Sequence, residues 1–159
     1  MDPIASQPEP SAIDPLRRIL VRDVMQKGVV TISVNERLST VEDIMTLGHL
    51  RHMPVVQAGQ LVGVVSERDL LRASLSHLSG HRDEERRAFL HVVEIAQVMS
   101  TPPVVVGPDV TIGEAAHVMA ERKIGCLPVV EGDVLLGMVT ETGVLELVAG
   151  VHPALARTD

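Results

Sequence analysis

Aromatic side chains are almost absent from this chain, which has 159 residues, one phenylalanine (Phe89) and no tryptophan or tyrosine. A planar ligand would therefore have no ring to stack on, and would lie between aliphatic side chains and backbone. No apolar run approaches the roughly 20 residues needed to span a bilayer, so we expect no membrane partner. The first residues lack the basic and then apolar order of a signal peptide.

Cysteine and positive charge are also scarce. The single thiol, Cys126, excludes an internal disulfide and fits a reducing compartment, so we expect a cytoplasmic protein. The formal net charge is −7. Nonspecific nucleic-acid binding depends on neutralising phosphates, so this balance predicts no nucleic-acid partner.

What the chain does contain is an internal repeat with a fixed period of 74 residues. Val24-Met25 recurs as Val98-Met99, and the two Pro-Val-Val segments at 54–56 and 128–130 keep the same spacing. The third pair is Gly63-Val64-Val65-Ser66-Glu67 and Gly137-Met138-Val139-Thr140-Glu141. A fixed period without gaps indicates two copies of one supersecondary unit. Because a copy of about 50 residues is marginal as an isolated domain, we expect the copies to share a core.

The apolar periodicity predicts a β-α-β-β-α order in each copy. The first copy is predicted to hold a helical turn at 20–25, strands at 29–34, 53–56 and 61–65, and helices at 39–48 and 66–73. The second is predicted to hold strands at 104–106, 127–130 and 134–139, and helices at 112–121 and from 140 onward. The predicted domain plan is a disordered tail at 1–15, repeats at 16–73 and 94–150, a linker helix at 74–93 and a tail at 151–159.

The linker carries a charged stretch followed by an apolar stripe at helical spacing. Phe89, Val92, Val93 and Ala96 form the stripe. We expect this stripe to face the core, with a contact between two chains as the alternative.

The segment from Gly63 to Asp69 has the chemistry of a nucleotide site. A buried strand ends where a helix begins, and a helix N-terminus offers unpaired N–H groups and a partial positive charge that suit a phosphate. Ser66 can add a hydrogen bond, and Asp69, one turn further on, can accept from two adjacent hydroxyls such as those of a ribose. The same two residues also match a capping box, which would only satisfy the helix itself. This segment alone leaves both interpretations open.

Taken together, the paired motifs resemble those of tandem CBS domains, which are named for cystathionine β-synthase and also called a Bateman module. The resemblance runs from about Leu20 to Val148 and rests on the Val-Met, Pro-Val-Val and Gly-x-x-Ser/Thr segments of both copies. It implies an α+β fold in which two β-α-β-β-α repeats pack as a pseudo-twofold pair, and a flat, disc-like homodimer. It also implies a regulatory module that binds AMP, ADP or ATP between the repeats, with S-adenosylmethionine or NAD as alternatives.

The family pattern assigns roles to individual residues. Ser66 would face the phosphate and Asp69 the ribose, with the second copy closing the cleft. The implied nucleotide-binding residues are Val64, Ser66, Arg68, Asp69, Pro103, Val104, Val106, Lys123, Gly125 and Cys126.

The second copy departs from this pattern, because Gly143 stands where the ribose-binding aspartate is expected. The residues of a second candidate nucleotide site are Thr31, Arg51, His52, Met138 and Thr140. Since the ribose contact is the more specific one, we expect the Ser66 cleft to be the occupied one.

Other chemistry is weakly indicated. A lone Cys126 at the start of a strand is typical of a buried apolar thiol, and the pairs His49/His52 and His77/His81 have no cluster to complete a metal site. We therefore expect no metal, no cofactor and no enzymatic activity. A rival hypothesis is a ligand-free interaction module, in which Ser66 and Asp69 only cap a helix. A third is a regulatory subunit of a separately encoded enzyme or transporter.

Overall fold

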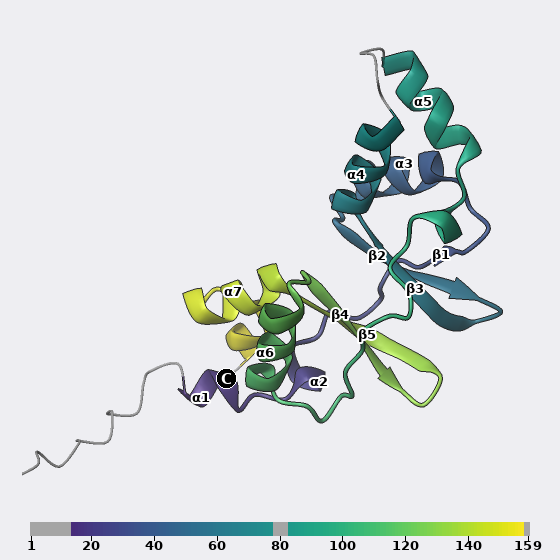
Figure 1. Ribbon diagram of the computed structural model, residues 1–159. Helices are drawn as coiled ribbons and strands as arrows, with labels where there is room; N and C mark the ends of the chain where they lie inside the picture. Colours follow the sequence, from purple (N-terminus) through teal and green to yellow (C-terminus); the bar gives the residue numbers. More distant parts are fainter. Residues whose placement is uncertain (1–13, 78–82, 158–159) are drawn as a thin grey trace, which may run out of the picture.

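The computed structural model describes residues 14–77 and 83–157, which form two lobes (Figure 1). The predicted tail at 1–15 lies outside the described residues except for Asp14 and Pro15, and His81 lies outside them too. The first part of the chain contains α1 (Asp14–Arg17), α2 (Val21–Val24), β1 (Ile32–Ser33), α3 (Leu38–Gly48), β2 (His52–Gln57), β3 (Gln60–Ser66), α4 (Glu67–His77) and α5 (Asp83–Val92). The second part contains η1 (Ile95–Gln97), α6 (Ile112–Arg122), β4 (Cys126–Glu131), β5 (Val134–Thr140), α7 (Glu141–Ala149) and η2 (Pro153–Arg157).

Each lobe is built on a β-hairpin covered by helices. In the first lobe β2 runs antiparallel to β3 and parallel to β1, with Ile32 opposite Val55. In the second, β4 pairs with β5, and Val106 forms a single parallel bridge to Val129. The α+β prediction of two repeats is confirmed, but the predicted first strands at 29–34 and 104–106 are too long. In the second copy prolines flank the strand on both sides, and a proline has no N–H to donate to a ladder.

Each repeat opens with a lead segment, residues 20–26 in the first repeat and 94–100 in the second. Each lead segment packs on the lobe of the other repeat. Val21 is fully buried in the second lobe, and Ile95 is fully buried in the first. Backbone bridges repeat this exchange: Gln26 pairs with Met138, and Ser100 pairs with Val64. Both partners of one bridge are 74 residues from a partner of the other, which is the expected signature of a pseudo-twofold axis. The packed lobes therefore differ from the sequence repeats 16–73 and 94–150.

This exchange explains the glycine of the Gly-x-x-Ser/Thr motif. A Cβ at Gly137 would lie 2.5 Å from the carbonyl oxygen of Gln26, and a Cβ at Gly63 would lie 2.8 Å from that of Ser100. The exchanged segments therefore cross the hairpins so closely that only glycine fits. The Val-Met and Gly motifs are two halves of one packing arrangement.

The predicted linker helix is divided into two parts. α4 continues to His77, and α5 packs against α3, where Arg86 and Glu42 form an ion pair. The core-facing stripe of α5 differs from the predicted one. Leu90 is fully buried, with Phe89 and Val93 beside it, whereas Val92 and Ala96 are exposed. No helix within residues 14–77 and 83–157 is both long and apolar enough to cross a membrane.

Candidate functional site

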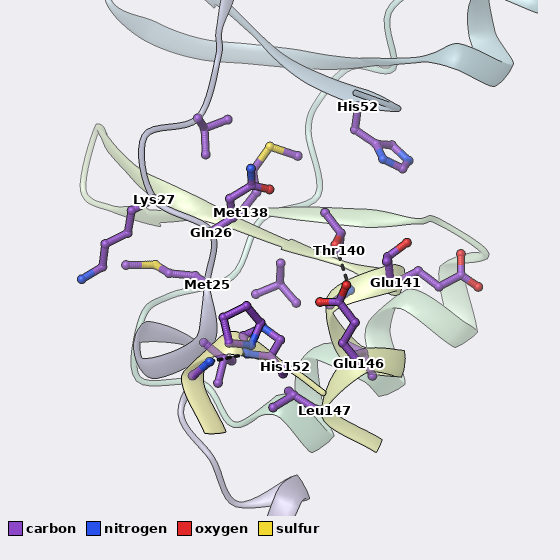
Figure 2. Close-up of a pocket in the computed structure, with 18 of the residues that line it drawn as sticks. Met25, Gln26, Lys27, His52, Met138, Thr140, Glu141, Glu146, Leu147 and His152 are labelled. Carbon is purple, nitrogen blue, oxygen red and sulfur yellow. Dashed lines mark hydrogen bonds between the residues drawn. The ribbon is translucent and has the colours of Figure 1, made fainter. Parts of the chain in front are cut away.

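A cleft of about 820 Å³ lies where the two repeats meet. The first repeat supplies the segments 22–30 and 48–52, and the second supplies the end of β5 and the first turns of α7. A third wall comes from residues 152–154, which follow α7. Figure 2 shows Thr140, at the junction of β5 and α7, between His52 of the first repeat and His152.

Thr140 caps the helix that points into the cleft. Its Oγ1 accepts a hydrogen bond from the backbone N–H of Gly143 at 3.1 Å, which leaves the hydroxyl hydrogen free to donate elsewhere. The N–H of Glu141 is already paired with the carbonyl of Gly125 at 2.8 Å. The positive end of the α7 dipole and the Thr140 hydroxyl therefore favour an anion at the start of α7, whereas the carboxylates of Glu141 and Glu146 on the same helix oppose it.

Charged and apolar groups both line the cleft. Arg22, Lys27 and Arg51 bring positive charge from the first repeat, while Asp23 of that repeat and Glu141 and Glu146 of α7 bring carboxylates. Methionine and branched aliphatic side chains supply the apolar lining. They include Met25, Val29, Val30, Leu50, Met138 and Val144. This combination fits a ligand with an anionic end, hydroxyls and a flat apolar part held without aromatic stacking.

His52 lies at the boundary between the repeats. A Cβ at Gly125 would come within 2.9 Å of His52 Nε2, so the glycine makes room for the imidazole. Burial is the main cause that lowers the pKa of His52 below its ordinary 6.5. Arg51 and Arg68 act in the same direction, whereas Asp69 and Glu141 oppose them. His52 is therefore neutral at pH 7.

The lowered pKa of His52 predicts a loss of stability in mild acid. Above pH 6.5 this imidazole is neutral in both the folded and the unfolded chain. As the pH falls from 6.5 through the lower folded pKa, the unfolded chain binds a proton that the folded chain resists, so the free energy of unfolding decreases. Removing the imidazole in His52→Gln should remove this part of the loss. Urea unfolding at pH 7.5 and 5.5 measures it. The exposed His117→Gln is the control, and an equal acid loss in both variants would contradict the prediction.

Ser66 and Asp69 form a capping box at the start of α4. Asp69 Oδ2 accepts from the Ser66 backbone N–H and from its hydroxyl, each at 2.8 Å, and Ser66 Oγ accepts from the Asp69 N–H at 3.1 Å. The two predicted ligand groups thus satisfy each other. That a ligand occupies the Ser66 cleft stays a prediction. The hydrogen bonds between Ser66 and Asp69 are those of a capping box.

Only some of the other predicted site residues line the cleft of about 820 Å³. Arg51, His52, Met138 and Thr140 all line the cleft, and Val30 lines it in place of the predicted Thr31. Gly125, assigned by the resemblance to the Ser66 cleft, also lines it.

The other residues assigned to the Ser66 cleft have different environments. The Val64 backbone is paired with Ser100, and Arg68 and Lys123 are exposed. Pro103 and Val104 are half-buried. The side chains of Val106 and Cys126 are buried.

Sequence reasoning missed several residues of the cleft. The sequence predicts a helical turn at 20–25 and nothing at 26–28, yet the segment 22–28 forms one wall. Glu146 and His152 were not singled out. A signal for Glu146 exists in the repeat, because its counterpart 74 residues earlier is Arg72.

Cys126 does not form a reactive centre, and the pair His77/His81 cannot be judged because His81 lies outside the described residues. Burial, reinforced by the charge of Asp69, raises the pKa of Cys126 to about 12, so its thiol stays protonated and a poor nucleophile. Within the described parts of the chain, no group of three or more His, Cys, Asp or Glu could hold a metal ion.

The sequence matches the CBS domain family over residues 21–76 and 95–150. The chain therefore belongs to the CBS domain family and carries two copies of the domain. A CBS domain-containing protein from Dictyostelium discoideum is 29% identical over 136 residues, which cover 84% of this chain and 94% of that protein.

Solved structures agree with this assignment. The CBS domain of a CBS domain-containing membrane protein from Sphaerobacter thermophilus has a TM-score of 0.70 and 29% identity, and the match covers 84% of this chain and 90% of that one. The CBS domain pair of protein MJ0100, solved with 5′-methylthioadenosine and S-adenosyl-L-methionine, has a TM-score of 0.70. That match covers 82% of this chain and 96% of the other, and at 23% identity it shows the fold alone.

Proposed function

We propose that this chain is a regulatory module that senses an adenosine-containing ligand in the cleft between its two repeats. AMP, ADP and ATP are the expected ligands, with S-adenosylmethionine and NAD as alternatives. The observation that carries the proposal is the cleft of about 820 Å³, which has a threonine-capped helix N-terminus on one wall and Lys27 and Arg51 on another. The phosphate would lie at Thr140, and the base would lie among the aliphatic side chains.

The same geometry explains how binding would be converted into a signal. The cleft is lined by both repeats, so a bound ligand contacts both at once. A ligand shifts the arrangement of the repeats only by binding one arrangement more tightly than another. No catalytic step is part of this proposal, and the module would act in the cytoplasm, where adenine nucleotides are available.

Three capping residues at helix N-termini provide a matched test of the site. Ser66 caps α4, Thr111 caps α6 in a capping box with Glu114, and Thr140 caps α7. Replacing any of them with alanine should cost about 1 kcal/mol of stability through the lost cap. Only Thr140→Ala should also weaken nucleotide binding, on the order of tenfold, because only Thr140 would lose a hydrogen bond to a charged group.

Isothermal titration calorimetry with AMP, ADP, ATP, NAD and S-adenosylmethionine measures this, together with ligand-dependent melting. Thr111→Ala is the control for the lost cap and should keep the wild-type affinity. Loss of binding in Ser66→Ala alone would place the ligand in the Ser66 cleft, as predicted from the sequence. No binding of any of these compounds at millimolar concentration would defeat the proposed function.

A ligand-free interaction module is the second candidate, and the capping box of Ser66 and Asp69 favours it. In that case none of the adenine compounds would bind the wild type, and Asp69→Ala would only lower the stability by about 1 kcal/mol. A pull-down that retains a separately encoded enzyme or transporter would support this candidate.

We further propose a homodimer formed through α4 and α7. Leu71 and Leu75 on α4, and Leu145 and Val148 on α7, are each between 52% and 64% exposed. Leu71 and Leu145 are equivalent positions of the repeat, and Figure 1 shows α4 and α7 on the same side of the molecule. Equivalent apolar groups on both halves of a pseudo-twofold pair suit association with a second copy.

A further inference from the structure

Gly143 leaves an open space in the wall of the cleft. The equivalent position in the first repeat carries the carboxylate of Asp69, one turn into the helix. A Cβ at Gly143 would lie 3.4 Å from Thr140 Oγ1 and 4.0 Å from His152 Nε2, both ordinary contact distances. The space beside Thr140 is therefore bounded by His152 and contains no side chain from position 143.

A carboxylate returns one turn further along α7. Glu146 follows Gly143 by three residues, so both face the same side of the helix. Helical side chains also lean toward the N-terminus, which brings the Glu146 carboxylate back toward position 143. Glu146 is half-buried and lines the cleft, and Figure 2 shows its side chain extending toward Thr140. Between the repeats, the pair Asp69 and Arg72 has become Gly143 and Glu146, which moves the carboxylate by one turn.

His152 supplies a hydrogen-bond donor to the same space. α7 ends at Gly150, and the backbone N–H groups of Val151 and His152 both donate to the carbonyl of Glu146, at 2.9 and 3.2 Å. His152 Nδ1 accepts from the Ala154 N–H at 3.1 Å, so the ring proton is on Nε2, which faces the Gly143 side. A carboxylate acceptor and an N–H donor thus face one pocket of the cleft.

We propose that Glu146 and His152 recognise the two adjacent hydroxyls of a ribose in the Thr140 cleft. The Glu146 carboxylate accepts from both hydroxyls, and His152 Nε2–H donates to one of them. This inference rests on the proposed function and adds a specificity to it: the cleft requires a ribonucleotide and discriminates against the 2′-deoxy form. In the second repeat the position equivalent to Asp69 is Gly143, and Glu146 and His152 would bind the ribose in its place.

The test compares each adenine nucleotide with its 2′-deoxy form by isothermal titration calorimetry. Wild-type protein should bind the ribonucleotide on the order of tenfold more tightly, because the deoxy form loses one of the two hydrogen bonds to a charged acceptor. Glu146→Gln should weaken binding of the ribonucleotide more than binding of the deoxy form, so that the ratio of the two affinities falls. His152→Ala should reduce the same ratio, and it serves as the second variant if Glu146→Gln does not fold.

Two control variants separate this role from a general effect of charge. Glu141→Gln removes another carboxylate of the cleft and should change both affinities alike, so that their ratio is kept. Asp69→Asn should leave both affinities unchanged. If the ratio is lost in Asp69→Asn and kept in Glu146→Gln, the ribose lies in the Ser66 cleft, and the inference is overturned while the proposed function stands. Equal binding of both forms by the wild type also overturns it. No nucleotide binding at all would instead defeat the proposed function.

Discussion

Replacing Gly137 with alanine should destabilise the chain by about 3 kcal/mol, which lowers Tm by roughly 6–12 °C in a chain of this size. The new Cβ would lie 2.5 Å from the carbonyl oxygen of Gln26 and 3.0 Å from Met25 Sδ. A methionine side chain can rotate away, but a backbone oxygen cannot. Gln26 is held by two hydrogen bonds to Met138, at 2.8 and 3.0 Å, so moving its backbone breaks the crossing of the lead segment.

Urea unfolding followed by circular dichroism measures this loss, with two other glycines for comparison. Gly63→Ala should be similarly destabilising, because its Cβ would lie 2.8 Å from the carbonyl of Ser100. Gly107→Ala is the matched control, since a Cβ there meets nothing within 4 Å. Its stability should stay within about 0.5 kcal/mol of wild type. If Gly137→Ala proved as stable as Gly107→Ala, the exchanged arrangement of lead segments would be wrong.

The same variant connects the fold to the proposed site. The crossing at Gln26 holds the segment 22–30, which forms the first-repeat wall of the cleft. Gly137→Ala should therefore weaken nucleotide binding more than Gly63→Ala does, because the equivalent crossing segment at Ser100 does not line this cleft.

The sequence predicted the elements that have a strong local period. The hairpins and the helices α3 and α6 agree with the structure to within about one residue at most ends, because turn residues and apolar spacing define them. It did not predict that Val21 packs in the second lobe. A repeat shows which residues are equivalent, but it does not show on which copy a segment packs, since that depends on contacts about 100 residues apart in the chain.

The candidate site was predictable only in part, for a similar reason. The loss of the carboxylate at Gly143 was visible in the repeat, and the grouping of Arg51, His52 and Thr140 was implied by the resemblance to CBS domains. That Ser66 and Asp69 satisfy each other depends on side-chain geometry. The segment after α7 is predicted only as a tail, and the N–H groups of Val151 and His152 at its start donate to the carbonyl of Glu146.

Charge placed on α4 and α7 should dissociate the proposed homodimer. In Leu71→Asp/Leu145→Asp, each chain loses two exposed leucines, and a dimer loses four. Leucines buried at an interface are worth about 1.5 kcal/mol or more each, or about 6 kcal/mol together, which is on the order of 10⁴ in Kd. Because both leucines are exposed in the single chain, the variant should keep its fold and differ from the wild type only in association.

Analytical ultracentrifugation distinguishes the two states, since the monomer mass is 17.1 kDa and a dimer has twice that mass. The wild type should sediment as a dimer at micromolar concentration, and the double variant as a monomer. Leu47→Asp is the matched control: Leu47 is 83% exposed on α3, outside the proposed interface, so its variant should remain a dimer.

A monomeric wild type would assign the leucine-rich face to a different protein. A dimeric double variant would place the interface elsewhere on the molecule. If the dimer forms as proposed, it brings α7, the helix that Thr140 caps, into the contact between chains. A ligand in the Thr140 cleft would then act on the assembly as well as on the two repeats.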